Sequence, residues 1–131
     1  MLLDPVLNQY LSDLEKLIST LTDVYVEKYE EEIITSKRLN LRLRIRMNND
    51  FLFELNEAVF CENAELKHLG YRYHFQDRNN KLIFRYDNTP HFHGLKNFPH
   101  HKHLPDKVIE AEPPDILEVI KQACDFILAS P

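Results

Sequence analysis

The sequence predicts an α+β fold in which an N-terminal and a C-terminal helix cover the apolar face of an antiparallel meander sheet. Apolar residues recur at helical spacing near both ends of the chain and alternate with polar residues through most of the middle. Four to five strands are expected, followed by a long histidine-rich loop. With 131 residues and 44% hydrophobic content, the chain can bury one core, so we expect a single domain over residues 1–131.

The N-terminal segment is predicted to be an amphipathic helix. Asp4 followed by Pro5 supplies a helix cap and a first helical residue. We expect this helix to pack on the sheet, although a helix that binds a partner would show the same pattern. Its apolar stripe recurs at spacings of three and four residues: Leu3, Leu7, Tyr10, Leu14, Leu17 and Leu21.

The middle of the chain is predicted to form consecutive antiparallel strands. Residues 24–36 can form an acidic first strand, although their three successive glutamates could equally extend a helix. In residues 37–47, apolar residues alternate with arginine and asparagine, which predicts a half-buried strand with one cationic face. Residues 51–60 run back after a turn, and residues 68–77 and 81–87 form a further pair joined by turn residues.

After Asp87 no periodicity appears until about Pro114, and so long a segment in a small domain predicts a functional loop. The chain then ends in a second helix, which opens at Pro113, Pro114 and Asp115. Its apolar side carries Ile116, Val119, Ile120, Ala123 and Ile127.

Composition argues against several classes of protein. No run of about 18 apolar residues occurs, and Asp4 and Pro5 interrupt the place of a signal peptide, so we expect a soluble, cytoplasmic protein without membrane contact. Cys61 and Cys124 are far apart and lack a C-x-x-C spacing, which gives no support to a disulfide framework or a zinc knuckle.

The net charge of −5 is unevenly distributed along the chain. Residues 36–105 hold twelve Lys and Arg against seven Asp and Glu, whereas both flanking segments are acidic. Because the local field steers encounters more than total charge does, the basic middle predicts an anionic ligand.

A row of arginines is the first candidate binding feature. Arg42, Arg44 and Arg46 project from one strand face about 7 Å apart, close to the spacing of successive phosphates. Together with Arg72 they are the candidate nucleic-acid-binding residues. The alternative is a solvated face on which Glu54 and Glu57 of the next strand pair with these arginines.

The second feature is the group of histidines, five of the chain's seven, within residues 90–106. A metal-free ribonuclease could use two imidazoles as general base and acid, since histidine titrates near neutrality and RNA carries its own 2′-hydroxyl nucleophile. A cation would stabilise the phosphorane charge, and a carboxylate would orient a histidine. The candidate catalytic residues are therefore Arg85, Asp87, His91, His100, His101, Lys102 and His103, with no metal and no cofactor expected.

Other interpretations of the same histidines stay open. His91 with His93, and His101 with His103, have the i, i+2 spacing that points two rings the same way, and Asp87 could complete a zinc or iron site. The histidines could instead bond backbone carbonyls in a rigid loop. Likewise, Arg85 and Asp87 could form an ion pair that holds the end of their strand.

Two motifs resemble those of the TumE family, the toxin component of prokaryotic type II toxin–antitoxin modules. They are Arg-Tyr-Asp-Asn at residues 85–88 and Phe-Pro-His-His-Lys-His at residues 98–103, and the resemblance extends over residues 37–128. The family pattern often has alanine at the position of Thr89, and two successive histidines follow the proline where this chain has His91-Phe92-His93.

The resemblance implies a cytoplasmic growth inhibitor that is neutralised by a cognate helix-turn-helix antitoxin of the TumA kind. It also implies a nuclease or another inhibitor of translation. Taken with the residues, it predicts a small metal-independent ribonuclease that binds RNA. The alternatives are a metal-dependent hydrolase that uses the same histidines, or a non-enzymatic module that binds nucleic acid or a partner. The oligomeric state is open, with a homodimer as one candidate.

Overall fold

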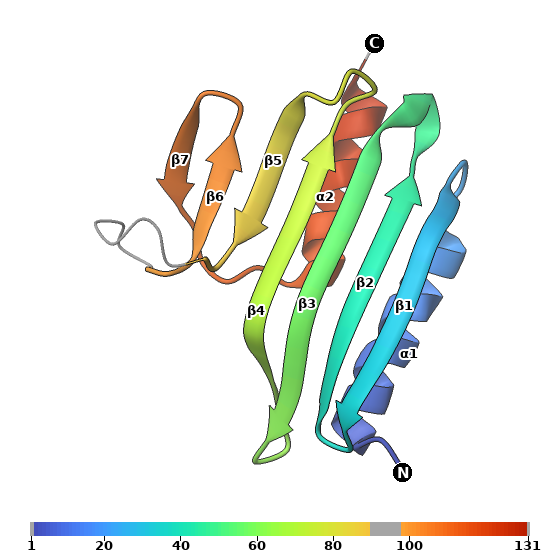
Figure 1. The fold of residues 1–131 in the computed structure, drawn as a ribbon. Helices are drawn as coiled ribbons and strands as arrows, with labels where there is room; N and C mark the ends of the chain where they lie inside the picture. The colour runs from blue at the N-terminus through green and yellow to red at the C-terminus, as the bar shows by residue number, and fades with distance from the viewer. Residues whose placement is uncertain (1, 90–97, 131) are drawn as a thin grey trace.

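The computed structural model describes residues 2–89 and 98–130. Its strands form one antiparallel sheet in which each strand pairs with the next along the chain (Figure 1). The elements are α1 (Pro5–Thr20), β1 (Tyr25–Thr35), β2 (Arg38–Arg46), the short 3-10 turn η1 (Asn48–Asp50), β3 (Leu52–Glu62), β4 (Glu65–Gln76), β5 (Leu82–Asp87), β6 (His101–Leu104), β7 (Lys107–Glu110) and α2 (Ile116–Ala129). The predicted α+β class, with a helix at each end of a meander, is confirmed.

Both helices lie on the same side of the sheet (Figure 1). Each begins as its sequence predicts: Asp4 Oδ1 accepts the Val6 backbone N–H at 2.9 Å, and the carboxylate of Asp115 accepts the Leu117 N–H at 2.8 Å. The apolar stripes of the helices meet the apolar side chains of the sheet in one core. We call this covered side the helix face and the other side the open face.

Strand alternation divides the residues of β2 between the two faces. Leu39, Leu41, Leu43 and Ile45 are buried against the helices. The arginines between them therefore belong to the open face. The same parity continues across the sheet, since Leu43 pairs with Leu55 and Arg42 with Asn56 in the register of β2 and β3.

The sheet has more strands than predicted, because the segment expected to be a long loop contains β6 and β7. These two strands are four residues long and pair with each other, and β6 also pairs with β5. A strand this short shows at most two alternations of apolar and polar residues, which is too few for a periodicity to stand out. The hydrogen bonds that define β6 come from pairing with β5 and β7, and those that define β7 come from pairing with β6.

A bulge in β4 changes which residues of that strand face the helices. The register shifts between Ala58 and Val59, which pair with Gly70 and His68, so Leu69 is the additional residue. His68 consequently shares the helix face with Tyr71 and Tyr73.

Two further expectations concern the cysteines and the membrane. Cys61 and Cys124 are both free, Cys61 being buried and Cys124 partly so. Among the described residues, no helix has the length and apolar character needed to cross a membrane.

Candidate functional site

Pairing of β5 with β6 brings four of the predicted catalytic residues together. Arg85 pairs with His103, and Asp87 pairs with His101, so the four side chains occupy one patch of the open face. Residues 85–87 and 101–103 are distant in sequence, and the strand register makes them neighbours about 4.8 Å apart. We call Asp87, His101 and His103 the Asp–His–His cluster.

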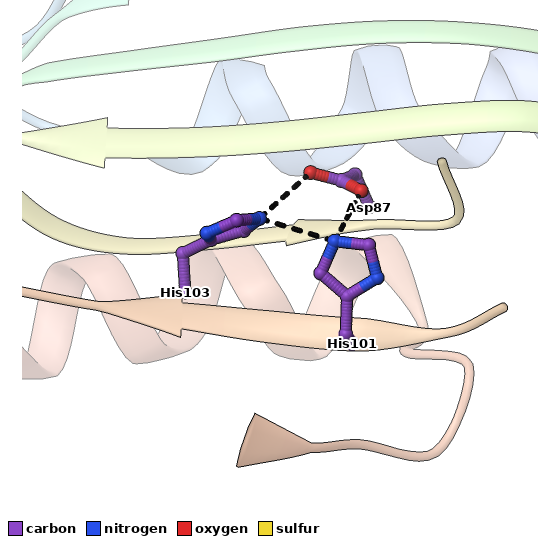
Figure 2. A group of neighbouring side chains, drawn as sticks. All are labelled: Asp87, His101 and His103. Atoms are coloured by element: carbon purple, nitrogen blue, oxygen red, sulfur yellow. Dashed lines mark hydrogen bonds and ion pairs between the residues drawn. The ribbon is translucent and has the colours of Figure 1, made fainter. Parts of the chain in front are cut away.

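The side chains of the cluster converge on one another (Figure 2). His101 Nε2 lies 2.7 Å from Asp87 Oδ1 and 3.0 Å from His103 Nε2, while His103 Nε2 lies 3.4 Å from Asp87 Oδ2. The other ring nitrogen of His101, Nδ1, lies 2.9 Å from the Pro99 carbonyl oxygen. The Thr89 backbone N–H donates to Asp87 Oδ1 at 3.1 Å. These contacts hold both the carboxylate and the His101 ring in one orientation.

Burial differs within the cluster. The side chains of His101 and Asp87 are 1% and 6% exposed, whereas that of His103 is 17% exposed. Loss of hydration, followed by the positive charge of Arg85, lowers the pKa of His103 below its usual value, and Asp87 opposes this effect. A lowered pKa favours the neutral imidazole, which can accept a proton or bind a metal ion.

Arg85 lies beside the carboxylate of the cluster. Its Nε atom is 3.5 Å from Asp87 Oδ2 and is buried without a hydrogen-bond partner. The ion pair between Arg85 and Asp87, which the sequence left as an alternative, is therefore present, but it is a long one. The Arg85 side chain is 25% exposed, so its guanidinium group remains accessible to an anion from solvent.

A shallow groove of about 450 Å³ runs over the open face next to the cluster. Arg38, Arg42 and Arg72 line it, and Asn88 and Thr89 form the end that adjoins Asp87. Within residues 2–89 and 98–130, these three arginines form no ion pair. Because Arg72 pairs with Asp87 in the register of β4 and β5, the cationic groove and the cluster are contiguous.

The remaining two predicted arginines have acidic partners. Arg44 Nε lies 2.8 Å from Glu27, and Arg44 Nη1 lies 3.2 Å from Glu54. Arg46 Nε lies 3.4 Å from the same Glu27. For these positions the alternative of ion pairs between neighbouring strands is the one observed, with one glutamate from β1 and one from β3.

His100 and Lys102, which were predicted to act with the cluster, do not join it. His100 stacks on Tyr71, whose hydroxyl lies 2.9 Å from His100 Nδ1. The Lys102 Nζ atom lies over the rings of Tyr86 and Phe84, at 4.8 and 5.3 Å from their centroids. Lys102 belongs to the helix face, because it lies between His101 and His103 in β6 and neighbouring residues of a strand point to opposite sides. His100 precedes β6, and its stacking on Tyr71 puts it on the helix face as well. His91 and His93 lie outside the described residues.

A second polar cluster on the helix face was not predicted. The Glu57 carboxylate is fully buried, which contradicts its expected pairing with the arginines on the other face. It accepts hydrogen bonds from the hydroxyls of Tyr10 and Tyr73, the latter at 2.7 Å, and lies 3.0 Å from His68 Nε2. The position of Glu57 in the apolar alternation of Phe53, Leu55 and Val59 is the sequence signal that could have revealed its burial.

The two clusters differ in the chemistry that they can support. Glu57 receives its hydrogen bonds from neutral tyrosines inside the core, as expected of a buried structural carboxylate. Asp87 lies among two imidazoles and a guanidinium, beside a groove lined with unpaired cations. The arrangement around Asp87 combines proton-accepting or metal-binding groups with a binding surface for anions.

Comparison with known protein families identifies a match over most of the chain. A family model described as Toxin TumE matches residues 14–130, from the middle of α1 through the end of α2. No curated protein and no solved structure matches the chain.

Proposed function

The chain belongs to the TumE toxin family, and on that premise we propose that it is an endoribonuclease whose reaction centre is the Asp–His–His cluster. The observation that carries the proposal is the continuity of the cluster with the groove of Arg38, Arg42 and Arg72 on one sheet face. Unpaired arginines suit a phosphate backbone, and imidazoles suit the proton transfers of RNA cleavage.

The proposed reaction needs no nucleophile from the protein. The 2′-oxygen of the RNA forms a bond to phosphorus, and the bond from phosphorus to the 5′-oxygen breaks. A base takes the proton of the 2′-hydroxyl, and an acid returns a proton to the departing 5′-oxygen. Arg85, beside the cluster, and Arg72, in the next strand, are placed to stabilise charge on the phosphoryl oxygens.

The base could be supplied in two ways. His103, the most exposed member of the cluster, could accept the proton directly, in line with the metal-free mechanism predicted from the sequence. A metal ion held by the cluster could instead present a bound water, as in the alternative of a metal-dependent hydrolase. The convergence of ligand atoms from three side chains favours the second way.

Membership of a toxin family implies an antitoxin partner. Our proposal extends to a helix-turn-helix antitoxin of the TumA kind and to a cytoplasmic toxin that inhibits translation by cleaving RNA. A homodimer, one candidate for the open oligomeric state, is part of the same proposal. Co-purification with the neighbouring gene product and mass measurement in solution test these two assemblies.

Cleavage of purified RNA tests the proposed activity. The protein is incubated with total RNA and with tRNA, with and without EDTA, beside the His101→Ala variant. We expect the variant to cut about 100-fold more slowly or worse, because it lacks the imidazole at the centre of the cluster. A contaminating nuclease would cut equally well in both preparations.

The matched control is His68→Gln, which changes a histidine on the helix face and keeps a donor for Glu57. This variant should retain cleavage, and circular dichroism should show that both variants are folded. Equal cleavage by wild type and His101→Ala would refute the reaction centre. If RNA binds without being cut under any of these conditions, the protein is instead a binding module.

A further inference from the structure

We propose that Asp87, His101 and His103 form a binding site for one divalent transition-metal ion, such as Zn²⁺, Mn²⁺ or Fe²⁺. Among the described residues, these three offer ligand atoms that all lie within 4.8 Å of one another. Two imidazoles and one carboxylate form a ligand set that leaves coordination positions open for water or substrate. The inference rests on the proposed function for the role of the ion, while binding itself is measurable without RNA.

The distances between the ligand atoms suit a common ion. A metal that lies about 2.1 Å from each donor separates neighbouring ligand atoms by roughly 3.0 Å in octahedral and 3.4 Å in tetrahedral geometry. The two imidazole nitrogens lie 3.0 Å apart, His101 Nε2 lies 2.7 Å from Asp87 Oδ1, and His103 Nε2 lies 3.4 Å from Asp87 Oδ2. Small movements of these side chains would therefore bring both nitrogens and the carboxylate, through one or both of its oxygens, into one coordination shell.

The hydrogen bond of His101 to the backbone determines what its other nitrogen can do. The Pro99 carbonyl oxygen can only accept, so His101 Nδ1 carries a proton and donates it. In the neutral ring, Nε2 then has a lone pair directed at an oxygen of Asp87, 2.7 Å away. Two acceptors at this distance repel each other unless a proton or a metal ion lies between them.

Protons on the two imidazole rings cannot satisfy the three contacts together. A proton on His101 Nε2 would satisfy the contact with Asp87, and the contact of His103 with Asp87 would require a second proton on His103 Nε2. Those two N–H groups would then face each other across the 3.0 Å between the rings. One cation at the centre satisfies all three pairs, because each ligand atom directs a lone pair toward it.

The surroundings of the cluster suit a metal site. The Pro99 carbonyl and the Thr89 N–H orient two of the three ligands, a role that outer hydrogen bonds commonly play around bound metals. Burial of Asp87 and His101 protects the ion, and the partial exposure of His103 leaves an approach from the open face. Two neighbouring charges oppose a cation: Arg85, on the side of Asp87 Oδ2, and Arg72, which pairs with Asp87 in the next strand.

When bound, the ion would polarise a phosphoryl oxygen or lower the pKa of its water toward neutrality. The adjacent groove would deliver a phosphate group to it. The proposed site thus specifies which kind of nuclease centre the open face carries.

Metal analysis of the protein, with any histidine tag removed, is the first test. After EDTA treatment and dialysis, calorimetric titration with ZnCl₂ and with MnCl₂ should show one equivalent bound by the wild type. His101→Gln and His103→Gln should each lower the affinity for whichever of these two ions binds more tightly, by about 100-fold or more. His100→Gln is the matched control, because it changes the adjacent imidazole on the other face of the sheet, and it should bind as the wild type does.

A spectroscopic measurement on the wild type keeps the test independent of how the variants fold. X-ray absorption of the zinc-loaded protein should show two imidazole nitrogens and one or more oxygens at about 2.0–2.1 Å. The proposal is overturned if no ion binds, if His100→Gln weakens binding as much as the cluster variants do, or if the absorption shows no imidazole. RNA cleavage that resists EDTA would refute the metal site and still support the ribonuclease proposal. A bound ion without RNA cleavage would support the metal site and refute the ribonuclease proposal.

Discussion

Asp87 and Glu57 show how the two faces of the sheet give similar residues different roles. Asp87 is surrounded by groups that can carry positive charge, namely two histidines and Arg85. Glu57 is surrounded by tyrosine hydroxyls and one histidine inside the core. Burial and the neighbouring carboxylate raise the pKa of Tyr10 and Tyr73, which keeps both hydroxyls protonated as donors. We therefore assign chemistry to the first carboxylate and structure to the second.

His74 should make the stability of the protein depend on pH. Burial is the largest cause that lowers the pKa of His74 below its ordinary value of 6.5, and Arg72 and Arg85 contribute in the same direction. Gln76 and Glu54 oppose the shift. As the pH falls below about 6.5, the unfolded chain binds a proton before the folded protein does, so the free energy of unfolding decreases.

The His74→Gln variant should therefore lose less stability between about pH 6.5 and pH 5 than the wild type does. Urea unfolding at a series of pH values, with EDTA present, measures the two slopes. His100 and His103, whose pKa values are also lowered, keep part of the dependence in the variant. Identical slopes would show that His74 is as easily protonated in the folded state as in the unfolded chain.

At the level of elements, the Glu57 cluster ties α1 to the sheet. Tyr10 comes from the helix, Glu57 from β3, and Tyr73 and His68 from β4, and all four side chains meet at one carboxylate. The surrounding contacts of α1 are apolar, made by Leu7, Leu11 and Leu14. Apolar contacts have little directional preference, whereas a hydrogen bond to a buried charge specifies how the helix is positioned.

Tyr10→Phe should destabilise the protein by about 1–3 kcal/mol, because it leaves a buried carboxylate with one donor fewer. Chemical denaturation measures this change in the free energy of unfolding. Tyr29→Phe is the matched control, since the Tyr29 hydroxyl donates to Glu31 in an exposed position. A loss for Tyr10→Phe no larger than that of the control would mean that water replaces the missing donor.

At the scale of the whole molecule, the open face has arginines with and without acidic partners. Glu27 of β1 and Glu54 of β3 pair with Arg44 and Arg46, while Arg42, at the middle of β2, and Arg72, on β4, form no ion pair among the described residues. The basic middle of the chain is thus divided into a paired part at the end of β2 and an unpaired part that lines the groove beside the cluster. Only the unpaired part should attract a polyanion strongly.

This division predicts different effects of arginine substitutions on RNA binding. Arg42→Gln and Arg72→Gln should each reduce the slope of log K against log salt concentration by about 0.7, which corresponds to one phosphate contact on a single strand. Arg44→Gln should change the slope much less, because Glu27 and Glu54 already compensate its charge. Fluorescence anisotropy with a labelled single-stranded RNA, in a His101→Ala background, measures the slopes. Equal slopes for the three variants would contradict the division.

Much of the fold could be predicted because it depends on local patterns. The stripes and caps of both helices and the alternation in β2 through β5 are contained in short windows of sequence, and all of these elements are present. The TumE resemblance was also local, carried by two short motifs, and the match over residues 14–130 confirms it. The alternation of side chains along a strand predicted that Arg85 and Asp87 share one face of the sheet. It likewise predicted that His101 and His103 point to the same side.

The rest depended on contacts between distant segments. No local pattern specifies that β6 pairs with β5 so that Asp87 lies opposite His101, or that the side of Lys102 is the one that the helices cover. The bulge that brings His68 to Glu57 is likewise a matter of register between β3 and β4. Helical stripes and strand alternation record which side of an element is apolar, whereas register is chosen by the hydrogen bonds and packing of two strands together. Most elements could therefore be predicted from the sequence, whereas β6, β7 and the site depended on pairing between strands.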